Sequence, residues 1–209
     1  MGERMSSLMF SSVLAEQGVK TMNFDVRKVL RTDSEFGEGA PQIEEIEKLA
    51  KQLLAPEIKD AIVVTQGFVG ADEDGRTTTL GRGGSDFTAA LLAEALDAEA
   101  CEIWTDVTGV YTTDPRITPA AHPLPELSFE EAAEMATFGA KVLHPATMEP
   151  ALHKDIKVFV TVTTAQNALF TTHMGVSTPL EAILLGKPPR ISGFLHAFAA
   201  SVMRQENPK

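Results

Sequence analysis

The stretch Gly75-Arg76-Thr77-Thr78-Thr79-Leu80-Gly81-Arg82-Gly83-Gly84-Ser85-Asp86 joins polar turn residues directly to an apolar helical run over residues 87–96. Three glycines in four positions let the backbone approach a ligand closely. Ser85 or Asp86 is expected to cap the following helix, so that the free helix amides point back toward the loop. With Arg82 available to grip a carboxylate or phosphate, the stretch predicts an anion-binding loop. The alternative is a glycine-rich surface turn before an ordinary helix.

The anion-binding loop is not one of the common phosphate-binding signatures. No Gly-x-x-x-x-Gly-Lys-Ser/Thr sequence occurs in the chain, and neither does His-Arg-Asp or Asp-Phe-Gly. P-loop NTPases and protein kinases are therefore not indicated.

The segments around the loop alternate between strand and helix patterns. The short continuous apolar run at 61–66 is typical of a strand buried on both faces, which favours a parallel sheet, and 101–107 is expected to form another buried strand. Helical spacing covers 41–54, with Pro56 expected to stop that helix, and a first helix over 5–14 is expected to end at Gly18. A capping box at Ser128 predicts a further helix, and the last strand expected is 156–160. The pattern predicts an α/β layered domain.

Bulk composition restricts the possible partners. The 209 residues are 44% hydrophobic, enough for one sizeable domain, and the formal net charge of −11 argues against nucleic acid or an anionic membrane as a partner. Cys101 is the single cysteine, so no internal disulfide can form and a cytoplasmic location is favoured. Its apolar surroundings indicate a buried small side chain rather than a nucleophile.

Several long blocks resemble one known family. They are Gln66-Gly67-Phe68, residues 75–86, Trp104 through Arg116, and Met135 through Pro145. Together, and in this order, they closely resemble the aspartokinases, with the lysine-sensitive, monofunctional type as the nearest fit. The resemblance covers roughly residues 1–160. It implies the amino-acid kinase fold, a three-layer α/β architecture with a mainly parallel sheet between helices.

The resemblance also implies a reaction. Aspartokinases transfer the γ-phosphoryl group of ATP to the side-chain carboxylate of L-aspartate, which gives 4-phospho-aspartate on the way to lysine, threonine and methionine. A carboxylate is already a nucleophile at neutral pH, so catalysis rests on positioning two anions and neutralising the charge between them. Mg²⁺ is expected to accompany ATP.

Site residues follow from the motifs that match the family. The resemblance implies an aspartate site made by Glu3, Phe68, Arg82, Gly83, Gly84 and Ser85. It implies a nucleotide site made by Thr105, Asp106, Tyr111, Arg116, Lys141 and Val142. Lys141 and Asp86 are the catalytic candidates, and no metal ligand is assigned. Without the family, Glu3 is equally well a solvated helix acid, Lys141 an ordinary cation near a helix end, and Asp86 a helix cap. His144 is interpreted as structural, because this chemistry needs no imidazole.

The sequence also departs from the family. Residues 1–160 are interpreted as a partial kinase domain that lacks the family's first strand and its Lys-Phe-Gly-Gly-Thr loop, and residues 161–209 as a divergent tail without regulatory domains. We expect the isolated chain to be weakly active or inactive as an aspartate kinase. The alternative is a non-catalytic module that binds ATP or aspartate, or that pairs with a separately encoded N-terminal half. A homodimer is possible, although the regulatory domains that help form it are not expected here.

Overall fold

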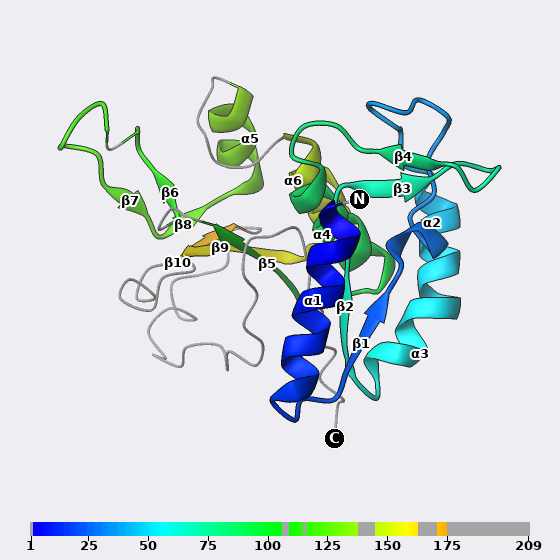
Figure 1. Cartoon of the computed structure of the whole chain (residues 1–209). Helices are drawn as coiled ribbons and strands as arrows, with labels where there is room; N and C mark the ends of the chain where they lie inside the picture. Colours follow the sequence, from blue (N-terminus) through cyan, green and yellow to red (C-terminus); the bar gives the residue numbers. More distant parts are fainter. Residues whose placement is uncertain (1, 106–108, 115, 138–144, 163–170, 175–209) are drawn as a thin grey trace.

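The computed structural model describes residues 2–105, 109–114, 116–137, 145–162 and 171–174 (Figure 1). The first half contains α1 (Gly2–Glu16), β1 (Thr21–Phe24), η1 (Val26–Lys28), α2 (Ile43–Leu49), the π-helical turn η2 (Ala50–Leu54), α3 (Ala55–Ile58), β2 (Ile62–Thr65), β3 (Val69–Ala71) and β4 (Thr77–Thr79). The second half contains α4 (Gly84–Ala95), β5 (Ala100–Thr105), β6 (Val110–Tyr111), β7 (Pro123–Leu124), β8 (Glu126–Leu127), α5 (Phe129–Thr137), α6 (Pro145–His153), β9 (Lys157–Val162) and β10 (Thr171–Met174).

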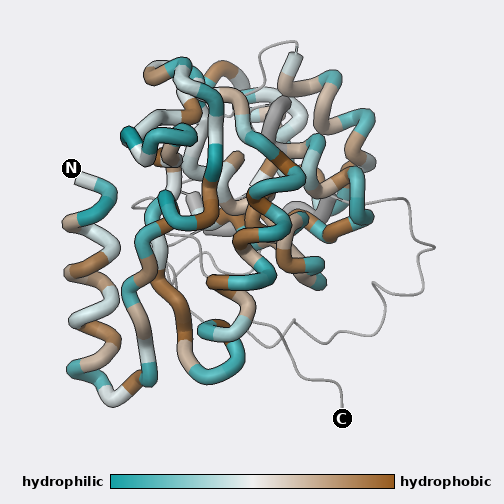
Figure 2. Tube along the Cα trace, turned by 90° about the vertical axis from the view of Figure 1, so that its right-hand side faces the viewer, coloured by the Kyte–Doolittle hydropathy of each residue, from teal (hydrophilic) through white to brown (hydrophobic). Residues whose placement is uncertain are grey.

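Strands β1 and β2 form a parallel pair between two layers of helices. Thr21 lies opposite Ile62 and Phe24 opposite Thr65. Figure 2, followed from the N-terminus, shows α1 at one edge of the molecule, the strand pair next to it, and further helices beyond the strands. The side chains of Phe24 and Val63 lie in one buried cluster with Ile46 of α2. The three-layer α/β arrangement expected from the sequence is confirmed here.

A second sheet has the strand order β5-β9-β10-β8. The β5–β9 pair is parallel, β9 and β10 are antiparallel, and β10 and β8 are parallel. In the part of the chain that is described, the β1–β2 pair and this four-stranded sheet are two separate sheets.

Helix α4 connects the two halves of the core. Ala89 and Ala93 lie in the cluster built on β5, β9 and α6, whereas Leu91, Leu92 and Ala95 lie in the cluster built on β1, β2 and α2. Nine of the twelve residues of α4 are buried. Helix α4 therefore packs against both clusters of the core.

The β3–β4 hairpin leads into the glycine-rich loop that precedes α4. Its turn is organised by the fully buried Asp72, whose carboxylate accepts hydrogen bonds from Arg76 N at 2.8 Å, Arg76 Nε at 2.8 Å and Ser34 Oγ at 3.2 Å. Gly75 has a φ of 75°, which a turn at this position needs. The expected turn and the short strand at 76–80 are therefore present.

Some sequence expectations were wrong. The helix after residue 41 continues through Pro56, which occupies the first turn of α3, where a missing N–H costs nothing. The wide π turn η2 just before it takes up the change in hydrogen bonding. Helix α6 and strand β10 were not expected at all.

Helix α1 presents its apolar residues outward. Met5, Leu8, Met9 and Val13 are exposed, whereas Ser7 and Ser11 are buried toward β1 and β2. The helix ends as expected at Gly18, whose N–H donates to Ala15 O at 3.0 Å. Among the described residues, no helix is long and apolar enough to cross a bilayer.

Candidate active site

The glycine-rich loop turns sharply into α4. Gly81 and Gly83 have φ angles of 75° and 72°, and the Gly84 N–H donates to Gly81 O at 3.1 Å. Gly83 is the N-cap of α4, and it provides no side-chain hydrogen bond to the helix. The prediction that Ser85 or Asp86 caps this helix was wrong. The helix begins earlier, because the left-handed conformation of Gly83 lets the chain enter it directly.

The earlier start of α4 places Ser85 and Asp86 in its first turn. Neither is engaged in capping, and both line a cavity in front of the helix. The cavity has a volume of about 310 Å³. Its described lining residues are Glu3, Phe68, Gly81, Arg82, Gly83, Gly84, Ser85 and Asp86. The lining therefore includes all six residues predicted for the aspartate site, together with the catalytic candidate Asp86.

Phe68 is fixed in an unusual backbone conformation at the rim of this cavity. Its φ is 71°, a left-handed conformation that is uncommon for a residue with a Cβ. The Phe68 N–H donates to Thr88 Oγ1 at 3.0 Å, and Phe68 O accepts from Leu80 N at 2.9 Å. The Thr88 hydroxyl in turn donates to Gly84 O at 2.7 Å. These bonds hold the Phe68 backbone against the start of α4.

Two glycines are required because segments pack closely around the cavity. A Cβ on Gly84 would lie 2.9 Å from Phe68 Cδ2 and 3.0 Å from Leu80 Cβ. A Cβ on Gly67 would lie 2.9 Å from Ser85 Cα. The absence of side chains at both positions keeps the loop, Phe68 and the first turn of α4 in contact.

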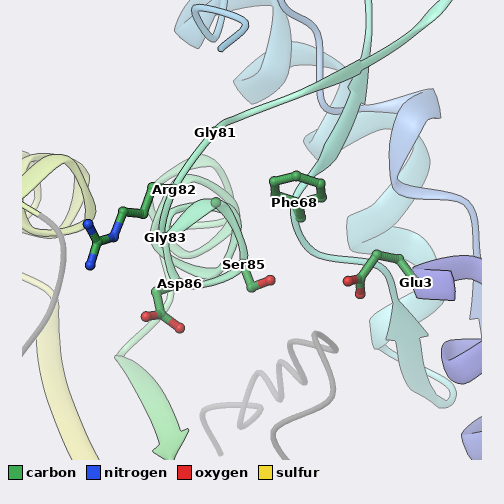
Figure 3. A pocket seen from close by; sticks show the side chains of 8 residues that line it. Glu3, Phe68, Gly81, Arg82, Gly83, Ser85 and Asp86 are labelled. Carbon is green, nitrogen blue, oxygen red and sulfur yellow. The ribbon is translucent and has the colours of Figure 1, made fainter. Parts of the chain in front are cut away.

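Glu3 reaches the cavity from a different element, the first turn of α1. Figure 3 shows the Glu3 carboxylate and the Ser85 hydroxyl on facing sides of the open space, with Phe68 between their two elements. Glu3 Oε2 is buried, and it has no hydrogen-bond partner among the described residues. Burial raises the pKa of Glu3. A carboxylate that has lost water and gained no donor is an attractive site for a cationic group.

Asp86 is the second carboxylate of the cavity. Burial raises the pKa of Asp86 above its ordinary value. Its carboxylate lies on the α4 side of the space in Figure 3. Two desolvated carboxylates around one cavity favour binding of a cation. An anionic ligand therefore needs the glycine-rich loop and Arg82 to balance its negative charge.

Arg82 is the one cationic side chain among the described lining residues. It is exposed, and Figure 3 shows its guanidinium directed away from Glu3, toward the far side of the loop. Arg82 lines the cavity, but its guanidinium must rotate before it can face Glu3 across the open space.

The residues expected to bind the nucleotide are described only in part. Asp106, Lys141 and Val142 lie outside the described residues, and Thr105 is the last residue of β5. Tyr111 is half-buried in β6, which pairs with β7, and the described lining of the cavity does not include it.

Arg116 is exposed and forms a two-pronged contact with its neighbour Asp114. Its Nε lies 3.0 Å from Asp114 Oδ1 and its Nη2 lies 2.6 Å from Asp114 Oδ2. The expectation that Tyr111 and Arg116 share a cleft with Asp106 and Lys141 stays a prediction, because the latter two lie outside the described residues.

Residues that support the site were missed from the sequence. Thr88 reads as one apolar-compatible position of a helix, and Ser7 as one of several serines in α1. Their importance comes from contacts with residues 20 and 59 positions away, Phe68 and Gln66. No local pattern carries that information.

The fold and the cavity together define a class of protein. Parallel strands lie between helices, and a glycine-rich loop opens onto the N-terminal end of a buried helix, which is how α/β proteins bind small anionic ligands. Residues 1–161 match the model of the amino acid kinase family. The chain belongs to the amino acid kinase family.

Relatives within this family confirm the resemblance to aspartokinases. The chain is 58% identical over 159 residues to lysine-sensitive aspartokinase 3 of Escherichia coli strain K12, a match that covers 76% of this chain and 35% of the relative. It is 44% identical over 156 residues to the bifunctional aspartokinase/homoserine dehydrogenase of Haemophilus influenzae, covering 74% of this chain and 19% of that protein.

Solved structures agree with the sequence comparison. The crystal structure of E. coli aspartokinase III in complex with aspartate and ADP superposes with a TM-score of 0.79 at 53% identity. That superposition covers 85% of this chain and 40% of the E. coli chain. The chain thus spans between about a third and two fifths of the length of these E. coli relatives.

Proposed function

We propose that this chain contains the aspartate site of an aspartate kinase, an enzyme that transfers the γ-phosphoryl group of ATP to the side-chain carboxylate of L-aspartate to give 4-phospho-aspartate. The proposal is supported by the cavity between α1 and α4 and by the similarity to aspartokinases. The product is the activated acid from which the biosynthesis of lysine and related amino acids starts.

The single observation that carries the proposal is the opposite polarity of the two cavity walls. On one wall, the buried Glu3 Oε2 has no hydrogen-bond partner among the described residues. On the other, the start of α4, the Ser85 hydroxyl and Arg82 are donors for anions, beside the Asp86 carboxylate. L-Aspartate carries one ammonium and two carboxylates, so the ammonium fits Glu3 and a carboxylate fits the α4 wall. Arg82 takes part after its side chain rotates toward the ligand.

The chemistry asks little of the protein beyond placement and charge. The side-chain carboxylate of aspartate attacks the γ-phosphorus, the bond from that phosphorus to the bridging oxygen breaks, and ADP leaves. No proton needs to be removed from the nucleophile, so no general base is required. Catalysis then rests on holding the two reactants in line and neutralising the charge between them.

The nucleotide side of the proposal uses the residues assigned from the family motifs. Thr105, Asp106, Tyr111, Arg116, Lys141 and Val142 form the ATP site in this proposal, with Lys141 serving the phosphates. The E. coli relative that was solved with aspartate also contained ADP.

Magnesium fits the donors that the cavity offers. Mg²⁺ binds proteins through one or two carboxylates and completes its shell with phosphate oxygens and water. Asp86 provides such a carboxylate, and no group of three or more metal-binding side chains gathers among the described residues. Bound Mg²⁺ would neutralise charge between the β- and γ-phosphates.

We further propose a cytoplasmic enzyme that acts on these small molecules and binds neither nucleic acid nor membranes, with a homodimer as a possible assembly.

Calorimetry and a coupled ADP-release assay test the proposal on the full 209-residue chain. We expect saturable binding of L-aspartate and of Mg-ATP, and weaker aspartate binding in Glu3→Gln and Arg82→Ala. Glu16→Gln, at the opposite end of α1, is the matched control and should bind as the wild type does. Failure of L-aspartate to bind, or binding that ignores both substitutions, would contradict the proposed site. Binding without turnover would retain the aspartate site and would agree with the weak or absent activity expected from the sequence.

A further inference from the structure

A buried hydrogen-bond chain connects the first turn of α1 to the end of β2. Gln66, which is 1% exposed, follows β2 and stands two residues before Phe68. Its Oε1 accepts from Val26 N at 3.1 Å, and its Nε2 donates to Ser7 Oγ at 2.7 Å. Ser7 is also 1% exposed, and its hydroxyl donates to Arg4 O at 3.2 Å. Each bond is needed, because polar atoms at this depth have no water to replace a lost partner.

The direction of these hydrogen bonds is fixed by the Val26 N–H. The backbone N–H of Val26 is a donor only, so it must face the carbonyl oxygen of the Gln66 amide. The NH₂ group of Gln66 then faces Ser7, whose hydroxyl accepts that hydrogen bond and donates one of its own to Arg4 O. The turn of helix that receives this bond is the turn that carries Glu3.

Arg4 makes a weaker contact from this end of α1 to another element. Arg4 Nη2 and Asp25 Oδ2 lie 3.7 Å apart, and the Arg4 side chain is 51% exposed. An exposed ion pair at that distance contributes little to holding a helix in place. Met5, Leu8 and Met9 face outward and do not anchor this turn either.

We infer that Gln66 and Ser7 are positioning residues that hold the Glu3 carboxylate in register with the glycine-rich loop of the aspartate site. The inference rests on the proposed function, because it assigns Glu3 to the ammonium group of the ligand. Gln66 is suited to this role because it lies two residues before Phe68, which lines the same cavity. One side chain therefore sets the spacing between the α1 wall and the α4 wall.

The test compares two ligands that differ by the ammonium group. Binding of L-aspartate and of succinate, which has the two carboxylates alone, is measured by calorimetry for the wild type and Ser7→Ala. Loss of one buried hydrogen bond is expected to weaken L-aspartate binding about 3- to 10-fold. Succinate binding should stay unchanged, because succinate makes no use of Glu3. In a Glu3→Gln background, Ser7→Ala should have no further effect on L-aspartate.

Matched variants separate positioning from general destabilisation. Ser11→Ala removes a buried hydroxyl one turn further along the same helix. The Ser11 hydroxyl lies 3.4 Å from Thr21 Oγ1. Ser11→Ala should leave the ratio of the two affinities unchanged, and Ser7→Thr, which keeps the hydroxyl, should restore it. An equal loss of both ligands in Ser7→Ala would overturn the inference.

The titration of Glu3, measured without ligand, tests the positioning role of Ser7 separately from the proposed aspartate site. If the wild type binds neither ligand, the proposed aspartate site is wrong. The carboxyl titration of Glu3, followed by NMR, still decides the positioning role. Release of Glu3 from its buried position in Ser7→Ala should lower its pKa toward the ordinary value, whereas an unchanged pKa would overturn the inference.

Discussion

The backbone N–H of Phe68 donates a 3.0 Å hydrogen bond to the hydroxyl of Thr88, one turn inside α4. This contact joins a residue with a left-handed backbone to the helix whose first turn lines the cavity. Because Thr88 Oγ1 also donates to Gly84 O, one buried hydroxyl connects Phe68 and Gly84, which both line the cavity. The shape of the site therefore depends on a residue that does not line it.

Replacing Thr88 by valine should weaken the site and the fold together. Valine keeps the volume but leaves the Phe68 N–H with one long bond, to Gly84 O at 3.3 Å. We expect a loss of about 1–3 kcal/mol in the free energy of unfolding, together with weaker L-aspartate binding, measured by urea denaturation and calorimetry. Thr88→Ser, which retains the hydroxyl, is the control. A valine variant as stable as the serine variant would show that the hydroxyl is dispensable.

A methyl group at Gly84 should clash with Phe68 and Leu80. Its Cβ would lie 2.9 Å from Phe68 Cδ2 and 3.0 Å from Leu80 Cβ, so one of these must move. We expect Gly84→Ala to cost about 1–3 kcal/mol of stability and to reduce aspartate affinity. Gly37→Ala, where the new Cβ meets nothing within 4 Å, provides the comparison. Equal behaviour of the two alanine variants in denaturation would be inconsistent with the packing described.

The raised pKa of Asp86 predicts a stability cost at neutral pH. Because burial favours its neutral form, the folded chain binds this proton more tightly than the unfolded chain. Stability from this group is therefore full below the ordinary aspartate pKa and is lost as pH rises through the raised folded pKa. Asp86→Asn removes the cost, so the variant should gain stability over the wild type at about pH 7 and lose that gain near about pH 3.5. Urea midpoints at the two pH values measure the difference, and a pH-independent difference would refute it.

Asp25 should show the opposite dependence on pH. Hydrogen bonds from the Arg27 side chain lower the pKa of Asp25, so its contribution to stability is present above the ordinary aspartate pKa and is lost as pH falls through the folded pKa. Asp25→Asn should therefore be less stable than the wild type at neutral pH, with the difference shrinking in acid. The same urea titrations report it, and a deficit that grows in acid would reverse the assignment.

Local chemistry in the sequence predicted much of the fold. The capping box was found because both partners lie within one turn, and Ser128 and Glu131 make both of its bonds, at 2.8 and 3.2 Å. The apolar run of β2 was found because three of its four residues are buried, as in a strand covered on both faces. Strands β5 and β9 were also found, but they bury alternate residues and leave Glu102 and Lys157 exposed, so burial on both faces was not the reason. Helix α6 was missed because its start at Pro145 and internal Pro150 hide the helical pattern.

The candidate site was predicted in its parts and not in its assembly. The glycines of the loop are visible locally, but Gly83 rather than Ser85 or Asp86 proved to be the cap, because backbone conformation is not encoded by side-chain preference alone. Glu3 entered through family resemblance and carries no local signal of its own. The link from Gln66 to Ser7 spans 59 positions, and only the packed structure brings the two side chains together.

Amide chemical shifts recorded while L-aspartate is titrated into the isotope-labelled chain test the central claim most directly. We expect saturable shifts at Phe68, Gly83, Gly84 and Ser85, which line the cavity, and small changes at Val110 and Tyr111 in β6. Shifts that leave the Gly83–Ser85 amides unmoved, or that gather on β6 and β7 instead, would contradict an aspartate site in this cavity.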